Sequence, residues 1–282
     1  MSIFPTKILL ATDGSKHAEL AATTAVDLAK STGSELHVVS VFPGPGYVHP
    51  YYETHFPEAA ERLRREARKE RQEVLDERVE RIREAGDSVA QTHIREGETA
   101  AEIVTFAEEL EAGLIAIGSR GLGAVRRMLM GNVSDSVVRH AHCPVMVVRG
   151  EAVLFPTKIL VATDRSREAQ LAATTAADLA KSTNSELHVV HVGFDQYRDE
   201  AQKELETEVG MIRESGAQEI HAHLEFGRPD TAIVALAEEL GAGLIVMGSR
   251  GLGGVRRALL GSISDSVVRH APCPVMVVRQ EG

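Results

Sequence analysis

Short apolar runs alternate with longer amphipathic segments along the chain, which is the pattern of an α/β protein with a mostly parallel sheet. Each run is long enough for a strand and too short for a helix. The predicted strands of the first half are Lys7–Thr12, Glu35–Phe42, Ser88–Ile94, Gly113–Ile117 and Val145–Val148. Those of the second half are Lys158–Thr163, Glu186–Val192, Glu219–Leu224, Leu244–Met247 and Val275–Val278. Helical periodicity in the first half predicts Asp13–Lys30, Glu58–Glu84, Thr99–Leu110 and Ser134–His140.

The second half of the chain repeats the first. Phe4-Pro-Thr-Lys-Ile-Leu-Leu-Ala-Thr-Asp13 returns as Phe155-Pro-Thr-Lys-Ile-Leu-Val-Ala-Thr-Asp164, and the glycine-rich stretch that begins at Gly118 returns at Gly248. Because the similarity covers nearly the whole chain, it indicates a duplicated domain and not an array of short repeats. We therefore predict two Rossmann-like α/β domains, residues 1–150 and 151–282, each of a usual size for one hydrophobic core.

The two halves differ in their middle sections. Residues 43–85 of the first half form an insertion, which contains three of the chain's four tyrosines (Gly46–Phe56) and the long predicted helix. The tyrosine tract is either a flap or subunit contact, or a plain surface insertion, and the sequence leaves both open. In the helix, Glu and Arg interleave at helical spacing, which predicts a solvated, salt-bridged face and not a nucleic-acid surface. Its apolar stripe consists of Leu63, Ala67, Val74, Val79 and Ile82.

Composition narrows the classes of function. The net charge of −10 argues against a general nucleic-acid or anionic-membrane binder. No apolar run reaches the roughly 20 residues of a membrane-spanning helix, and the first residues do not read as a signal peptide, so we expect a cytoplasmic protein. Cys143 and Cys273 occupy the same place in the two repeats, each before a buried strand. We expect small core residues there, without a disulfide.

The glycine-rich stretches are the candidate ligand site. Each follows the fourth strand of its repeat and leads into a helix, and free amides at such a junction bind anions. The predicted phosphate-binding residues are Gly118, Gly121, Gly131, Asn132 and Ser134, and in the second repeat Gly248, Gly251, Gly261, Ser262 and Ser264. Asp13 and Asp164 end the first strands, opposite these loops. Their carboxylates would suit sugar hydroxyls or a magnesium ion, or would cap the helices that follow.

The remaining motifs give weaker evidence of function. Neither half contains the P-loop pattern or a Gly-x-Ser-x-Gly elbow, and Gly121-Leu-Gly123 lacks the third glycine of a dinucleotide fingerprint. His221 and His223 share one face of a strand, but no carboxylate or thiol stands at metal spacing in the sequence, so we predict no zinc site there. The repeats share no Ser/His/Asp set near the glycine loops, so we assign no catalytic residue.

With these residues in place, the chain resembles the tandem form of the universal stress protein family. The nucleotide-binding motif of that family is Gly-x2-Gly-x9-Gly-Ser/Thr, with an Asp after the first strand. The second repeat matches it with Gly248, Gly251, Gly261 and Ser262, together with Asp164. The first repeat matches except that Asn132 replaces the hydroxyl residue. In the second repeat Arg165 replaces Gly14, where it would either clasp a phosphate or obstruct the nucleotide.

The resemblance implies a five-stranded parallel sheet in the order 3-2-1-4-5 in each domain. It also implies binding of ATP (or AMP, ADP or cyclic AMP) with magnesium, with adenine near Val41 and Val192. Members of the family pair through their last strands, which implies an intramolecular pseudo-dimer here, open to further homodimerisation. We expect an ATP-binding sensor or regulator of the stress response, with no nucleic-acid or membrane partner. A slow ATP hydrolase and a nucleotide-free interaction scaffold are the alternatives.

Overall fold

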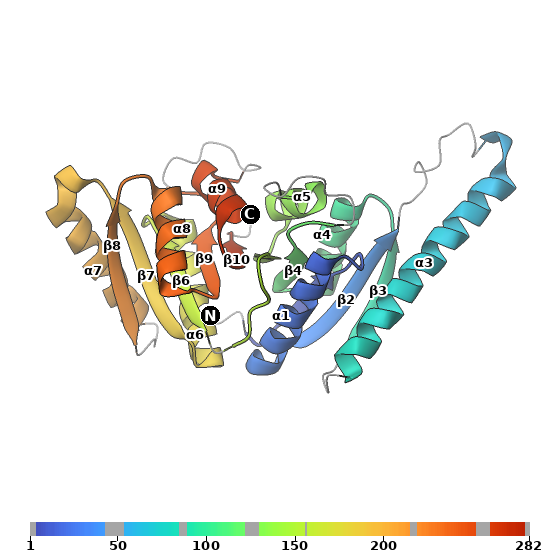
Figure 1. Cartoon of the computed structure of the whole chain (residues 1–282), viewed down its shortest axis with the longest axis horizontal. Coiled ribbons are helices and arrows are strands. Elements are labelled where there is room, and N and C mark those ends of the chain that lie inside the picture. Colours follow the sequence, from blue (N-terminus) through green and yellow to red (C-terminus); the bar gives the residue numbers. More distant parts are fainter. Residues whose placement is uncertain are drawn as a thin grey trace.

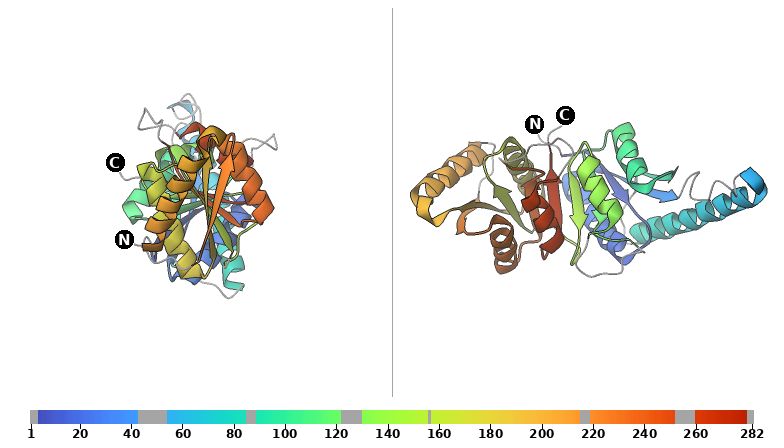
Figure 2. Two further views of the ribbon diagram at one scale, coloured as in Figure 1. Left: turned by 90° about the vertical axis from the view of Figure 1, so that its left-hand side faces the viewer. Right: turned by 90° about the horizontal axis from the view of Figure 1, so that it is seen from above.

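One sheet of ten strands runs through the whole molecule, with helices on both of its faces (Figures 1 and 2). The computed structural model describes residues 4–42, 54–84, 89–121, 130–155, 157–214, 219–251 and 260–279. The strand order is β3-β2-β1-β4-β5-β10-β9-β6-β7-β8, so each half has the order 3-2-1-4-5. Every neighbouring pair is parallel except β5 and β10. The predicted fold class is therefore confirmed.

The strands occupy nearly the predicted segments. They are β1 Lys7–Ala11, β2 Glu35–Phe42, β3 Gln91–Glu96, β4 Leu114–Gly118, β5 Val145–Val148, β6 Lys158–Thr163, β7 Glu186–Gly193, β8 Ile220–Phe226, β9 Leu244–Gly248 and β10 Val275–Val278. Central strands such as β4 and β5 are buried at every position, because helices cover both faces of the sheet. The edge strand β3 has no buried residue, and its polar sequence (Gln-Thr-His-Ile-Arg-Glu) made its bounds the least accurate of the predictions.

The helices divide between the two faces of the sheet. They are α1 Lys16–Thr32, α3 Pro57–Glu84, α4 Thr99–Leu110, α5 Asn132–His140, α6 Arg167–Thr183, α7 Arg198–Glu214, α8 Pro229–Leu240 and α9 Ser262–His270, with a short 3-10 helix η1 at Asp195–Tyr197. One hydrophobic core joins α1, α3, α6 and α7 to the sheet, and the other joins α4, α5, α8 and α9. Alternate strand residues enter opposite cores: Ile8 belongs to the first core and Leu9 to the second.

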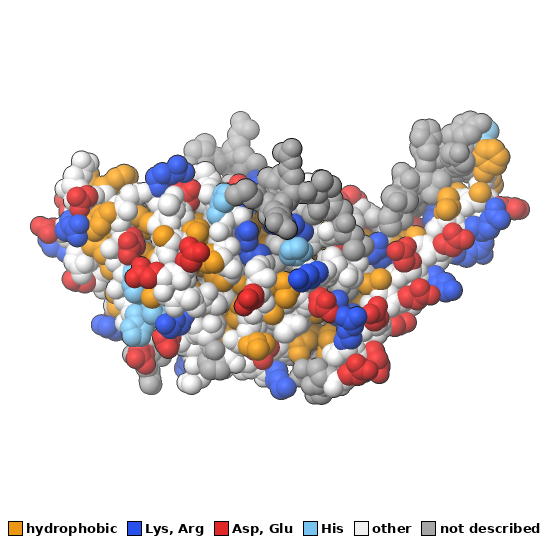
Figure 3. Space-filling model, in the orientation of Figure 1, with side chains coloured by type: hydrophobic (Ala, Val, Ile, Leu, Met, Phe, Trp, Pro, Cys, Tyr) orange, Lys and Arg blue, Asp and Glu red, His pale blue; other side chains and the backbone are white. Residues whose placement is uncertain are grey.

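Helix α3 extends far beyond the edge of the sheet (Figure 1). Its second half packs on β2 and β3 through Leu75, Val79 and Ile82, which are buried. Leu63, which we placed on the apolar stripe, is half exposed, because the sheet does not reach that far along the helix. Acidic and basic side chains are interspersed along the helix (Figure 3), as its sequence predicted. The tyrosine tract up to residue 53 lies outside the described residues.

The two halves join through the antiparallel pair β5–β10, with Met146 opposite Met276. This pairing, expected from the resemblance, covers the edge that each half-sheet would otherwise expose. Arg149, after β5, donates to the carbonyl of Val268 at the end of α9. Arg279, after β10, donates to the carbonyls of Val138 and Arg139 at the end of α5, at 2.6 and 2.8 Å. Each lobe thus caps a helix of the other.

Candidate functional site

The aspartate after the first strand and the glycine loop after the fourth strand lie against each other in both lobes. A Cβ atom added to Gly121 would lie within 3.0 Å of the Asp13 Oδ2 atom, and one added to Gly251 within 3.0 Å of Asp164 Oδ2. Both segments follow the carboxyl ends of neighbouring parallel strands, β1 with β4 and β6 with β9. The structure therefore brings together the two halves of the predicted site, at the position where open α/β sheets hold ligands.

The turn after β1 holds the aspartate in place. Asp13 Oδ1 accepts a hydrogen bond from the Ser15 amide at 3.0 Å, and the Ser15 hydroxyl accepts one from the Ala18 amide at 3.2 Å. Ser15 is therefore the N-cap of α1, and capping by Asp13, the alternative reading of that residue, is wrong. The Ser15 hydroxyl also lies 3.3 Å from the Arg120 carbonyl, to which it donates, so it ties the turn to the glycine loop.

The second lobe repeats this turn. Asp164 Oδ1 accepts from the Ser166 amide at 3.0 Å, and Ser166 caps α6 and donates to the Arg250 carbonyl at 3.3 Å. We did not single out Ser15 or Ser166 from the sequence. Their recurrence two residues after each aspartate was the signal that could have identified them.

Gly118 and Gly248 serve packing. A Cβ atom at Gly118 would lie 2.6 Å from the His17 carbonyl carbon, and one at Gly248 would lie 2.9 Å from that of Glu168. These glycines let α1 and α6 approach β4 and β9 closely. This close approach positions the loops that follow.

The loops end where α5 and α9 begin. Gly131 and Gly261 are the N-caps, and neither helix has a side-chain hydrogen bond at its cap. Their amides donate to the carbonyls of Ser119 and Ser249, at 2.9 and 2.8 Å, which closes each loop at its base. A helix N-terminus whose amides have no side-chain acceptor attracts anions. The side chain of Asn132 at the first position of α5 is exposed, as is that of Ser262 in α9.

The predicted role of Ser134 and Ser264 needs correction. Both side chains are buried, with 3% exposure each. The Ser134 hydroxyl donates to the Gly118 carbonyl at 2.9 Å, and the Ser264 hydroxyl to the Gly248 carbonyl at 2.8 Å. Each hydroxyl proton is thus used to join the helix to the end of its strand. These serines are positioning residues and not phosphate donors in this arrangement.

The two lobes differ beside the aspartate. Gly14 has a left-handed φ of +81° in the first lobe, and Arg165 keeps that conformation at +67° in the second. The Arg165 guanidinium pairs with Glu204 of α7. The side chain is therefore directed to the neighbouring helix, and the two alternatives that the sequence offered for Arg165 stay predictions. In the first lobe, Arg71 of α3 donates instead to the Asp13 carbonyl at 3.1 Å.

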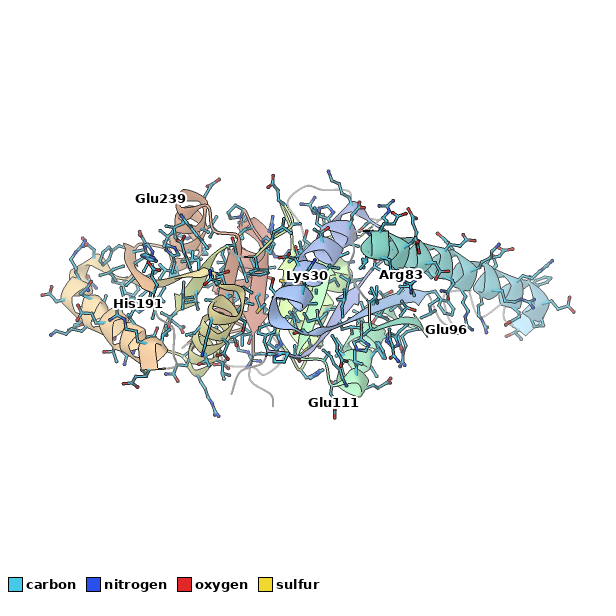
Figure 4. The ribbon with its side chains drawn as sticks, turned by 90° about the horizontal axis from the view of Figure 1, so that it is seen from below. Lys30, Arg83, Glu96, Glu111, His191 and Glu239 are labelled. Carbon is cyan, nitrogen blue, oxygen red and sulfur yellow. The ribbon has the colours of Figure 1, made fainter. Side chains whose placement is uncertain are left out.

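In the second lobe, two buried polar side chains, His191 and Glu208, lie near the Arg165–Glu204 ion pair. His191 Nε2 lies 3.4 Å from Glu204 Oε2, and Glu208 is only 2% exposed. Burial raises the pKa of Glu208, while a hydrogen bond with Thr163 opposes that shift. His191 lies between the sheet and α7, as Figure 4 shows. In the first lobe Ser40 stands at the strand position of His191, and its hydroxyl donates to the Thr12 carbonyl at 3.0 Å.

Val41 and Val192, the predicted adenine contacts, lie near the carboxyl ends of β2 and β7, next to the aspartate-bearing strands. Val41 is buried and Val192 is half-buried.

Residues 122–129 and 252–259, which contain the middle of each glycine loop, are outside the described part. Two grooves of about 700 and 450 Å³ lie around His142 and around Thr231, and neither aspartate lines them. Among the described residues, no helix is both long and apolar enough to span a membrane.

Comparisons with known proteins agree with this arrangement. The model of the universal stress protein family matches residues 5–149 and 156–279. A crystal structure of a universal stress protein from Archaeoglobus fulgidus is similar over 98% of either chain, with a TM-score of 0.73 and 32% identity. A universal stress protein of Mycolicibacterium smegmatis is 32% identical over 203 residues, which cover 67% of this chain and 68% of that protein. One from Mycobacterium tuberculosis is 35% identical over 60% of this chain, and the match spans 63% of that relative.

Proposed function

We propose that this chain, which belongs to the universal stress protein family as a tandem two-domain member, binds an adenine nucleotide in each lobe. The proposal rests above all on one observation: in both lobes a fixed carboxylate, Asp13 or Asp164, lies against the first turn of a glycine loop that ends at an uncapped helix. The nucleotide phosphates would lie on the loop amides and on the start of α5 or α9.

The carboxylate has two chemically reasonable tasks. It can accept hydrogen bonds from ribose hydroxyls, or it can hold a magnesium ion that bridges the phosphates. Adenine would then lie toward Val41 in the first lobe and Val192 in the second. ATP with magnesium is our first candidate ligand, ahead of ADP, AMP and cyclic AMP. Asn132 would offer an amide donor where Ser262 offers a hydroxyl.

We infer a regulatory role, in which nucleotide occupancy of a cytoplasmic protein reports on stress and is read by protein partners. A slow ATP hydrolase is the second candidate. The second lobe favours this candidate, because His191 and Glu208 lie near Asp164, where they would help to activate a water molecule. The hydrolase predicts phosphate release that disappears in Asp164→Ala, whereas the regulator predicts binding with negligible turnover.

The test is calorimetric titration of the full chain with each nucleotide, with and without magnesium, after mass spectrometry of the small molecules that survive purification. Gly251→Glu and Gly261→Glu should abolish binding in the second lobe through steric and charge conflict. Gly121→Glu and Gly131→Glu should do the same in the first lobe, so each lobe is the control for the other. If the wild type neither retains nor binds an adenine nucleotide, the nucleotide-free scaffold replaces this proposal.

A further inference from the structure

A second group of polar side chains lies at the opposite end of the second lobe's strands. Glu186, His188 and His221 each offer one ligand atom, and these three atoms lie within 4.8 Å of one another. Glu186 and His188 point to one face of β7, since they are two residues apart, and His221 is paired with His188 across the β7–β8 ladder. Figure 3 shows histidine side chains beside acidic ones on this side of the molecule.

His188 is the fixed member of the group. Its side chain is 6% exposed, and its Nε2 atom lies 3.4 Å from Glu186 Oε2. Its Nδ1 atom lies 2.9 Å from His223 Nε2, which holds the ring orientation. Metal-binding histidines are commonly oriented through their second nitrogen in this way. Glu186 and His221 have exposed side chains, at 54% and 44%, so they can rotate toward an ion while His188 stays in place.

We propose that Glu186, His188 and His221 bind a divalent transition-metal ion of the zinc class. Two imidazoles and a carboxylate are a known ligand set for zinc, and they leave a fourth position for water or another ligand. Ligand atoms around a tetrahedral zinc ion are about 3.4 Å apart. Glu186 Oε2 and His188 Nε2 already have this separation, and His221 has to approach them by no more than about 1.4 Å. A hydrogen-bonded ladder of imidazole and carboxylate groups without any ion is the competing explanation.

The first lobe supplies a natural comparison. Glu35 and His37 occupy the same strand positions, with His37 Nε2 at 3.4 Å from Glu35 Oε2 and its Nδ1 at 3.3 Å from His93 Nε2. The position of His221 is taken by Gln91, which pairs with His37 in the ladder. In the described residues, only the second lobe has a complete group of three metal ligands. Both lobes thus have the histidine on the inner strand and a second histidine that orients its ring. They differ in the third potential ligand, which is His221 in the second lobe and is replaced by Gln91 in the first.

The site is separate from the nucleotide crevice. Glu186 begins β7 and Gly193 ends it, so the two sites lie at opposite ends of an eight-residue strand, about 23 Å apart. An ion bound here would join the edge strand β8 to β7. It would therefore stabilise the folded state in proportion to its occupancy.

The experiment uses the full-length chain, freed of metal with a chelating resin and titrated with zinc chloride by calorimetry, with magnesium chloride as the negative control. We expect one zinc ion per chain, and at least about a tenfold loss of affinity in His221→Gln, which copies the first lobe. Glu186→Gln should weaken binding likewise. Gln91→His should add a second equivalent. Cobalt substitution should give the visible absorption of a tetrahedral ion in the wild type and not in His221→Gln.

Zinc binding of equal strength in the wild type and His221→Gln would overturn the proposal, as would no binding in the wild type. Thermal unfolding and nucleotide titration of His221→Gln are run beside it. Unchanged values there show that the variant is folded and that the outcome is independent of the nucleotide proposal.

Discussion

Gly251→Ala is the sharpest test of the arrangement around Asp164. The added methyl group would stand inside 3.0 Å of the Asp164 Oδ2 atom, whereas an ordinary contact begins at 3.4 Å. The carboxylate therefore has to turn away from the loop, although its Oδ1 atom is held by the Ser166 amide at 3.0 Å. The group displaced is the end of a side chain and not backbone, so we expect the free energy of unfolding to change by less than about 1 kcal/mol.

The effect on nucleotide binding should be larger. If Asp164 makes one charge-assisted hydrogen bond to the ligand, its loss costs about 1.5–3 kcal/mol. That corresponds to a roughly 10- to 150-fold increase in the dissociation constant of the second lobe. Gly121→Ala should act in the same way on the first lobe, through Asp13 Oδ2.

Calorimetric titration with ATP and magnesium measures this effect, with Gly210→Ala as the matched control. Gly210 lies within α7 with no atom near a Cβ position, so alanine there should leave binding unchanged and stabilise the helix by about 0.5–1 kcal/mol. In an Asp164→Ala background, Gly251→Ala should cause little further loss, because both changes remove the same contact. A dissociation constant within about twofold of wild type for Gly251→Ala would refute the role of this carboxylate.

Three further predictions concern the scaffold. Arg279→Ala removes two hydrogen bonds to carbonyls at the end of α5 and should lower the free energy of unfolding by about 2–4 kcal/mol in urea titration. The control Arg83→Ala, whose ion pair with Glu80 is exposed, should cost less than about 1 kcal/mol, and equal losses would contradict the inter-lobe cap. Burial raises the pKa of Glu208 above its ordinary value of 4.5, so the folded state holds this proton more tightly than the unfolded state. The free energy of unfolding therefore falls as the pH rises from 4.5 through the pKa of Glu208 in the folded protein. Glu208→Gln should therefore gain stability over wild type at about pH 8 and lose that gain toward pH 4.5, and a difference independent of pH would count against this cause. Burial raises the pKa of the Cys273 thiol to about 12, so a thiol reagent should modify it only after unfolding, and rapid labelling of the native protein would disprove its burial.

The sequence alone determined the elements and their repetition. Continuous apolar runs such as Leu114–Ile117 predict strands buried on both faces, because only a parallel sheet covered by two helix layers accommodates them. The repeated glycines after these strands predicted a ligand site, since a strand-to-helix junction has the same polar chemistry wherever it occurs. The predicted elements are confirmed because they depend on residues that are close together in the chain, whereas ligand binding at the glycines stays a prediction.

The tertiary structure decided which distant side chains meet. The sequence placed Ser134 on the ligand, but its hydroxyl is used by the Gly118 carbonyl across the strand end. Arg165 is held by Glu204, a partner on another helix that local sequence does not specify. His221 has Glu219 two residues before it in the sequence, and the register of β7 and β8 brings Glu186 and His188 beside it as well. Local patterns set the period and the ends of each element, whereas contacts across strands and helices depend on register and packing, which arise only when the chain folds.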